Sequence, residues 1–176
     1  MFFGAALVVV IILVIVMREE GEFKSPKEVH TLNDGDLNIE VAYSRPSKRG
    51  RDVFGALVPY DKIWRTGANE ATEFRTNKSL SFNGQTLPAG NYSVWTQPGA
   101  NTWKVFINST IPEWGINEDG AADHKPDTDV ISVEVASELV PETIEMFTMK
   151  VEKSDSVYNL IMSWDKTKVS VPFTQK

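Results

Sequence analysis

The chain of 176 residues contains no cysteine and only two histidines. The absence of cysteine excludes a disulfide scaffold, a thiolate metal cage, a thiol nucleophile and a lipid-modified cysteine anchor. A basic excess is also missing, since the formal net charge is −6, and this argues against nucleic acid as a partner. Hydrophobic residues make up 41% and aromatic residues 10%, which is too much for a disordered chain and fits one globular domain.

The longest apolar run lies at the N-terminus, where residues 2–17 carry neither a charge nor a hydrogen-bonding side chain. A helix of this length is about 25 Å long, at the low end of what crosses a bilayer. A cleaved signal peptide would need a basic start and a small-x-small cleavage site, and neither is found. We therefore expect residues 1–17 to be a retained transmembrane anchor. The basic residues Arg18, Lys24 and Lys27 that follow would, taken alone, leave the domain in the cytoplasm.

Residues 18–36 are charged and hold turn residues at Ser25-Pro26 and again at 33–36. Such a segment is poor in apolar side chains and predicts a mobile tether. The domain itself is then expected over residues 37–176.

From residue 37 onward the apolar residues recur with a period of two, which is typical of strands with one buried face. Ile131, Val133 and Val135 share one face, while Ser132 and Glu134 occupy the other. The same alternation recurs at residues 147–151, 158–164 and 169–173.

The strongest hairpin signal is Asn83-Gly84, because a type I′ turn needs two residues that tolerate positive φ. This turn would place Leu80 opposite Leu87. Short strands at such spacing, without a long amphipathic helix among them, predict an all-β fold. We expect a two-sheet sandwich or a jelly roll of about nine to ten strands.

Basic residues are concentrated between Arg45 and Arg65. Six stand there against two aspartates, which gives a local charge of +4 and leaves −10 for the rest of the chain. Guanidinium groups beside tyrosine and tryptophan can hold a carboxylate, phosphate or sulfate in bidentate fashion. The alternative is that these arginines pair with acidic residues elsewhere or point into water.

No metal or cofactor site is expected. The acidic loop over residues 117–129 lacks the ligand spacing of an EF-hand. His30 and His124 lie in the tether and in this loop, and nothing in their spacing suggests a pair of zinc ligands. No histidine sits in a recognisable nucleophile motif.

A long central motif carries a resemblance. It comprises residues 43–51 (YSRPSKRGR), 54–55 (FG), 57–60 (LVPY) and 64–72 (WRTGANEAT), and it continues in residues 87–93 (LPAGNYS), Trp114-Gly115 and Trp164. Over residues 29–173 the chain resembles a bacterial family of unknown function, the one numbered 2911. The resemblance implies a small, β-rich protein that is exported or membrane-attached, with its domain outside the cytoplasm. It implies no activity.

Three hypotheses follow for the function. The first is a non-enzymatic binding module that holds a small anionic or polar ligand in one cleft. The cleft would be lined by Arg45, Arg51, Arg65, Asn69 and Glu70, with Tyr60 and Trp64 as walls. Alanine at Arg45, Arg51 or Arg65 should then weaken binding and leave the fold intact. A structural interpretation of the same residues makes Arg65 and Glu70 a buried ion pair.

The second hypothesis is a hydrolase of saccharide or ester substrates with Glu70 as general acid or base, which would require a second carboxylate at a suitable distance. The third is an envelope scaffold that binds another protein through an exposed apolar patch.

Overall fold

The computed structural model describes residues 24–176. The prediction of an all-β fold is confirmed, and nine strands form it. They are β1 (Lys27–Asp34), β2 (Leu37–Ser44), β3 (Glu73–Thr76), β4 (Leu80–Phe82), β5 (Gln85–Leu87), β6 (Gly90–Pro98), β7 (Thr102–Asn108), β8 (Asp129–Ser154) and β9 (Val157–Gln175), with the 3₁₀ turn η1 (Pro126–Thr128) before β8. Between residues 24 and 176, no helix is long and apolar enough to cross a membrane.

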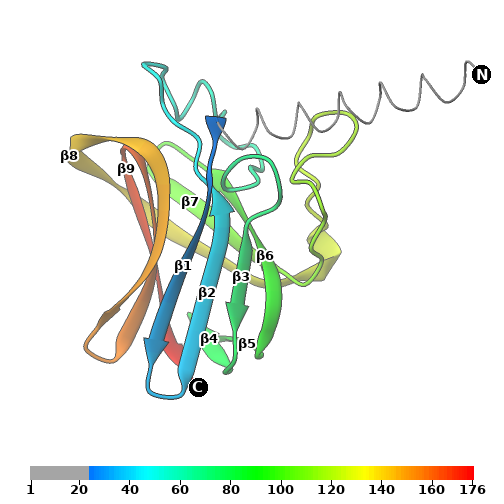
Figure 1. The fold of residues 1–176 in the computed structure, drawn as a ribbon, viewed down its shortest axis with the longest axis vertical. Coiled ribbons are helices and arrows are strands. Elements are labelled where there is room, and N and C mark those ends of the chain that lie inside the picture. Colours follow the sequence, from blue (N-terminus) through cyan, green and yellow to red (C-terminus); the bar gives the residue numbers. More distant parts are fainter. Residues whose placement is uncertain (1–23) are drawn as a thin grey trace, which may run out of the picture.

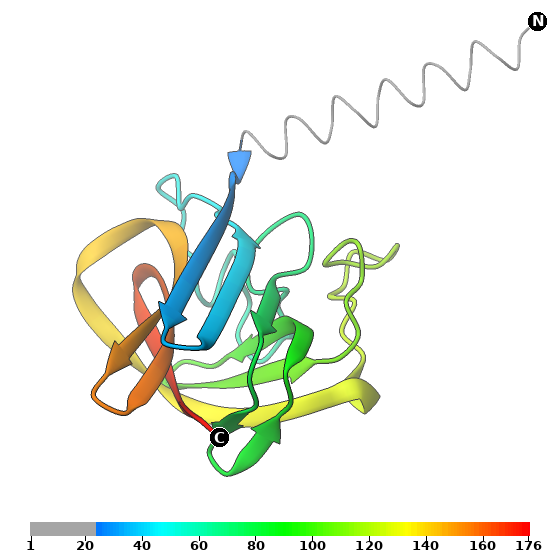
Figure 2. The ribbon, with the colours of Figure 1, turned by 60° about the horizontal axis from the view of Figure 1, so that its bottom comes forward.

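The strands form one antiparallel sheet rather than two separate sheets, in the order β1-β2-β3-β6-β7-β8-β9-β4-β5. The expectation of a two-sheet sandwich failed because residues 131–135 and 147–151 are not separate strands. Both belong to β8, which spans 26 residues. The first part of β8 pairs with β7 and the second part with β9. Register shifts between Leu139 and Thr148 let β8 bend, so the sheet curls around one core (Figures 1 and 2).

The alternating apolar positions supply that core. The side chains of Phe147, Met149 and Val151 on β8 are buried, and so are those of Leu160 and Met162 on β9. Burying one such side chain stabilises a fold by roughly 1.5–3 kcal/mol. The apolar residues that recur with a period of two in the sequence therefore lie on the inner face of the curled sheet.

The hairpin prediction at Asn83-Gly84 is confirmed. Both residues have positive φ, 46° and 81°, as a type I′ turn requires. Leu80 pairs with Leu87 across the hairpin, and both side chains are fully buried.

The predicted tether is wrong for Lys27–Asp34, because these residues form β1 and pair with β2 along its whole length. Its inward positions hold mainly polar side chains, which hid the strand from a search for apolar alternation. These side chains reach β8 instead: His30 Nε2 lies 3.1 Å from the carbonyl oxygen of Val151, and Lys153 donates to Asp34 at 2.6 Å. Residues 18–23 and the expected anchor over residues 1–17 lie outside the described residues.

The opposite edge of the sheet is held in a similar way. The Gln85 side chain on β5 donates to the carbonyl of Ser132 at 2.8 Å and accepts from its amide at 3.1 Å. The Gln85 side chain thus satisfies the backbone N–H and C=O groups of Ser132 on β8 in place of a neighbouring strand. Both edge strands are therefore tied to β8 by side-chain contacts, which limits edge-to-edge pairing with other chains.

Candidate functional site

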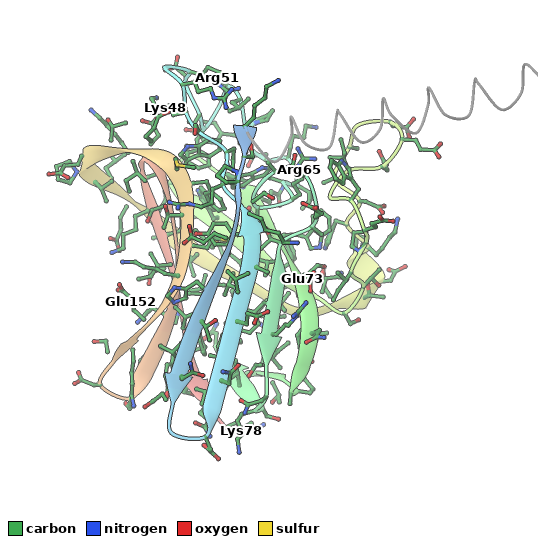
Figure 3. The ribbon with its side chains drawn as sticks, viewed as in Figure 1. Lys48, Arg51, Arg65, Glu73, Lys78 and Glu152 are labelled. Atoms are coloured by element: carbon green, nitrogen blue, oxygen red, sulfur yellow. The ribbon has the colours of Figure 1, made fainter. Side chains whose placement is uncertain are left out.

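Two long loops gather at the end of the sheet where the described chain begins. One joins β2 to β3 over residues 45–72, and the other runs from β7 to η1 over residues 109–125. In Figure 1 both lie at the end where β1 starts, and Figure 3 places Arg51 and Lys48 there, with Lys78 at the far end. The loops border a hollow of about 370 Å³. Its larger side chains are Lys24, Arg49, Arg51, Leu57, Val58, Ile63, Trp64, Arg65, Ile116 and Trp164.

Two tryptophans give the hollow a rigid wall. The rings of Trp64 and Trp164 stack with centroids 6.0 Å apart and planes at 18°. Each indole N–H is used, since Trp64 Nε1 donates to the carbonyl of Gly67 at 3.2 Å and Trp164 Nε1 to that of Glu145 at 3.1 Å. Rings fixed by stacking and by hydrogen bonds keep their orientation and exclude water from one side of the hollow.

Arg65 extends into this hollow from a firmly held segment. The backbone of Trp64 exchanges two hydrogen bonds with Thr96, at 2.7 and 3.0 Å. Thr66, with positive φ and full burial, accepts a bond from the Thr72 hydroxyl at 2.8 Å. The position of the Arg65 backbone is therefore determined on both sides.

The Arg65 guanidinium is the unusual group of the site. Its Nη1 atom is buried and has no hydrogen-bond partner in the part of the chain that the structure describes. Burial lowers the pKa of Arg65 from its usual range, although an arginine remains charged. Gly115 packs on its stem so closely that an added Cβ would lie 2.5 Å from Arg65 Cδ. A buried guanidinium N–H without a hydrogen-bond partner costs free energy, and an anion in the hollow could accept its hydrogen bond.

The other charged residues of the lining are also basic. Arg51 is anchored by bonds to the carbonyls of Lys48 at 2.9 Å and Ser47 at 2.7 Å. Arg49 Nη2 donates to the carbonyl of Lys24 at 3.1 Å. Among the described residues that line the hollow, no aspartate or glutamate is found. The charged side chains of the described lining are therefore all basic: Lys24, Arg49, Arg51 and Arg65.

Arg45 is not one of these lining residues, although the sequence placed it in the cleft. Its guanidinium forms an ion pair with Glu28 of β1 and donates to the carbonyl of Phe147 at 3.2 Å and to the hydroxyl of Thr148 at 3.1 Å. Arg45 thus links the end of β2 to β1 and β8, which is a structural role.

Three further candidates also lie outside the lining. The Tyr60 side chain is 41% exposed. Asn69 has a φ of 59°, and its carbonyl accepts a bond from the Gly115 amide at 3.1 Å, so it positions the second loop. Glu70 is half-buried. The predicted pair of Arg65 with Glu70 does not satisfy Arg65 Nη1, which stays without a partner.

The acidic loop and the residue before it supply one wall of the hollow, through Ile116, Gly120 and Ala122. It is closed on itself, because Asn117 Oδ1 accepts from the amides of Asp119 at 3.1 Å and Ala121 at 3.0 Å. Over residues 24–176, no group of three His, Cys, Asp or Glu side chains could hold a metal ion.

Of the residues that the sequence placed in one cleft, Arg51, Trp64 and Arg65 line the hollow. Its lining also includes Lys24, Arg49, Ile116 and Trp164, which the sequence analysis did not name as candidates. Arg49 belongs to the basic run and Trp164 to the family motif, so both had a signal. No sequence signal pointed to Lys24 or Ile116, because contacts between residues far apart in the sequence bring them to the hollow.

The fold and the site define a class: a single curled antiparallel sheet with a basic, tryptophan-walled hollow at its loop end. The chain belongs to the family described as protein of unknown function (DUF2911), whose sequence model matches residues 25–173. The match starts just before β1, in agreement with the place of that strand in the sheet. No curated protein and no solved structure matches the chain significantly.

Proposed function

We propose that this protein is a binding module that holds a small anionic ligand in the hollow between the two loops. The observation that carries the proposal is Arg65 Nη1, buried and without a partner, in a hollow whose charged lining side chains are all basic. A guanidinium in this state gains its missing hydrogen bond from an anion.

The geometry favours a compact ligand with a carboxylate, phosphate or sulfate group. A volume of about 370 Å³ is near the lower end of the usual range for small-molecule sites. The planar fork of guanidinium N–H donors matches two oxygens of such an anion. The indoles of Trp64 and Trp164 reduce competition from water. Arg49 and Arg51 line the same hollow and add to the positive potential.

Calorimetric titration of inorganic phosphate into the full chain, kept in uncharged dodecyl maltoside micelles, tests the proposal. We expect one site per chain and a loss of affinity of at least tenfold in Arg65→Met. The matched control is Arg75→Met, because Arg75 lies outside the hollow and pairs with Glu40 and Glu73 on the sheet. Equal affinity in the wild type and Arg65→Met, or equal loss in both variants, would reject the hollow as the site.

We also infer that residues 1–17 anchor the protein in a membrane, with the domain outside the cytoplasm. The apolar run of residues 2–17 supports the anchor. Mass spectrometry of the mature N-terminus should find these residues retained, and protease added to spheroplasts should digest the domain. Loss of about the first twenty residues would show a cleaved leader instead.

We do not propose the hydrolase, because Glu70 is not among the lining residues of the hollow and no observation favours it as an acid or base.

A further inference from the structure

The described chain begins at the hollow itself. Lys24 and Ser25 contribute to its lining. The carbonyl of Lys24 accepts a bond from Arg49, and the carbonyl of Pro26 accepts one from the Arg45 amide at 2.9 Å. These bonds fix the entry of β1 against the basic loop. Figure 2 shows the start of β1 at the end of the sheet where this loop lies.

The apolar run of the sequence ends a short way upstream. Six residues, 18–23, separate Met17 from Lys24. Even fully extended, the seven steps between these two residues cover about 25 Å. If residues 1–17 lie in a bilayer, as proposed above, the hollow is within this distance of the lipid headgroups.

The rim of the hollow is apolar as well as basic. Leu57 lines it and is 41% exposed, and Trp114, 38% exposed, is the neighbour of Gly115, which packs on Arg65. Exposed leucine and tryptophan beside basic side chains suit an amphiphile, whose charged head enters the hollow while its apolar part stays at the rim.

We propose that the anion held in the hollow is the phosphate of an anionic membrane phospholipid, with Arg65 as its principal contact. This inference rests on the proposed function and adds the class of ligand. A zwitterionic lipid fits less well, because no carboxylate among the described lining residues would receive a choline ammonium group. Glu118 and Asp119 are exposed at the tip of the acidic loop and oppose adsorption to an anionic surface. The proposal therefore concerns one bound headgroup rather than general attraction.

The test uses the full chain in dodecyl maltoside micelles doped with dioleoyl phosphatidylglycerol or dioleoyl phosphatidylcholine. Native mass spectrometry measures bound lipid as the lipid fraction rises. We expect one phosphatidylglycerol per chain and a preference of at least tenfold over phosphatidylcholine. Arg65→Met should abolish that preference.

A second pair of variants separates a lipid from free phosphate. Leu57→Asn should weaken phosphatidylglycerol binding at least threefold and leave the affinity for inorganic phosphate unchanged, since only the lipid reaches the apolar rim. Leu139→Asn is the matched control, because Leu139 on β8 is 87% exposed and is not part of the lining. It should change neither.

Three results would overturn the inference. If phosphate binds but phosphatidylglycerol shows no preference over phosphatidylcholine, the ligand comes from solution and the proposed function stands. If Leu57→Asn leaves phosphatidylglycerol binding intact, the apolar rim does not hold the lipid, and the argument for a lipid in this hollow fails while the proposed function stands. If neither phosphate nor phosphatidylglycerol binds the wild type, the proposed function fails too.

Discussion

Replacing Arg65 with methionine should leave the unliganded protein as stable as the wild type or make it more stable. Methionine keeps most of the length of the side chain and removes a partly buried charged group, whose buried Nη1 atom has no partner among the described residues. An unsatisfied buried polar group costs about 1–3 kcal/mol, and the space it occupied remains filled. We therefore expect the free energy of unfolding to stay equal or to rise by up to about 2 kcal/mol.

Replacing Arg45 with methionine should have the opposite effect. It leaves Glu28 without its cation and removes the bonds to the Phe147 carbonyl and the Thr148 hydroxyl. The pair is partly exposed, so it counts for about 1 kcal/mol at most, and each lost hydrogen bond adds about 1 kcal/mol. The sum is about 2–3 kcal/mol, which lowers the melting temperature by roughly 5–10 °C for a domain of this size.

Thermal unfolding of both variants, followed by near-ultraviolet circular dichroism with and without phosphate, provides the assay. Saturating phosphate, at about one hundred times its dissociation constant, should stabilise the wild type by about 2.7 kcal/mol and Arg45→Met by a similar amount. Arg65→Met should show no such increase. If Arg65→Met instead melts as early as Arg45→Met, Arg65 has a structural role and the reasoning is refuted.

Three further predictions follow. Gly115→Ala should weaken phosphate binding about tenfold in calorimetry without removing a charge, because the new methyl group would displace the Arg65 stem. Unchanged affinity would mean that the packing of Gly115 on Arg65 is unimportant for binding. The hydrogen bond from Lys153 holds the pKa of Asp34 below its ordinary value of 3.8, so Asp34→Asn should be less stable than the wild type above about pH 5. This difference in the free energy of unfolding should vanish as acid titrates Asp34 in the wild type. Urea unfolding at several pH values measures it, and a difference that grows in acid would contradict the prediction. Gly84→Ala should lower the free energy of unfolding by about 1 kcal/mol in the same assay, because φ is 81° with open space around it, and a neutral effect would argue against the turn type.

Local features of the fold could be predicted from the sequence because their determinants are local. Asn83-Gly84 specifies its turn through backbone conformations that few other residues adopt, and this set the pairing of Leu80 with Leu87. The bend of β8 could not be predicted in this way. It depends on register shifts against β9, and the sequence shows two apolar alternations with an interruption that resembles a loop.

The different surroundings of Arg45 and Arg65 could not be predicted from the sequence for a related reason. Arg45 is a structural residue because Phe147, 102 positions away, brings its carbonyl within reach, and because β1 supplies Glu28. Arg65 belongs to the same basic run but has no such partner for Nη1. Residue type and spacing are alike in the two cases, and only the neighbours contributed by distant strands distinguish them.

The contrast between these arginines is the strongest argument for a ligand. Packing alone does not account for Arg65, because an apolar side chain of similar length would fill the same space without the cost of desolvating a charge. A carboxylate in the lining would have neutralised the guanidinium within the protein, as Glu28 does for Arg45. Arg49 and Arg51 line the same hollow, and the described lining residues include no carboxylate, which supports the proposal of an anion from outside. If the apolar N-terminal run lies in a bilayer, as we propose, its closeness in the sequence to Lys24 makes a membrane lipid the nearest source of that anion.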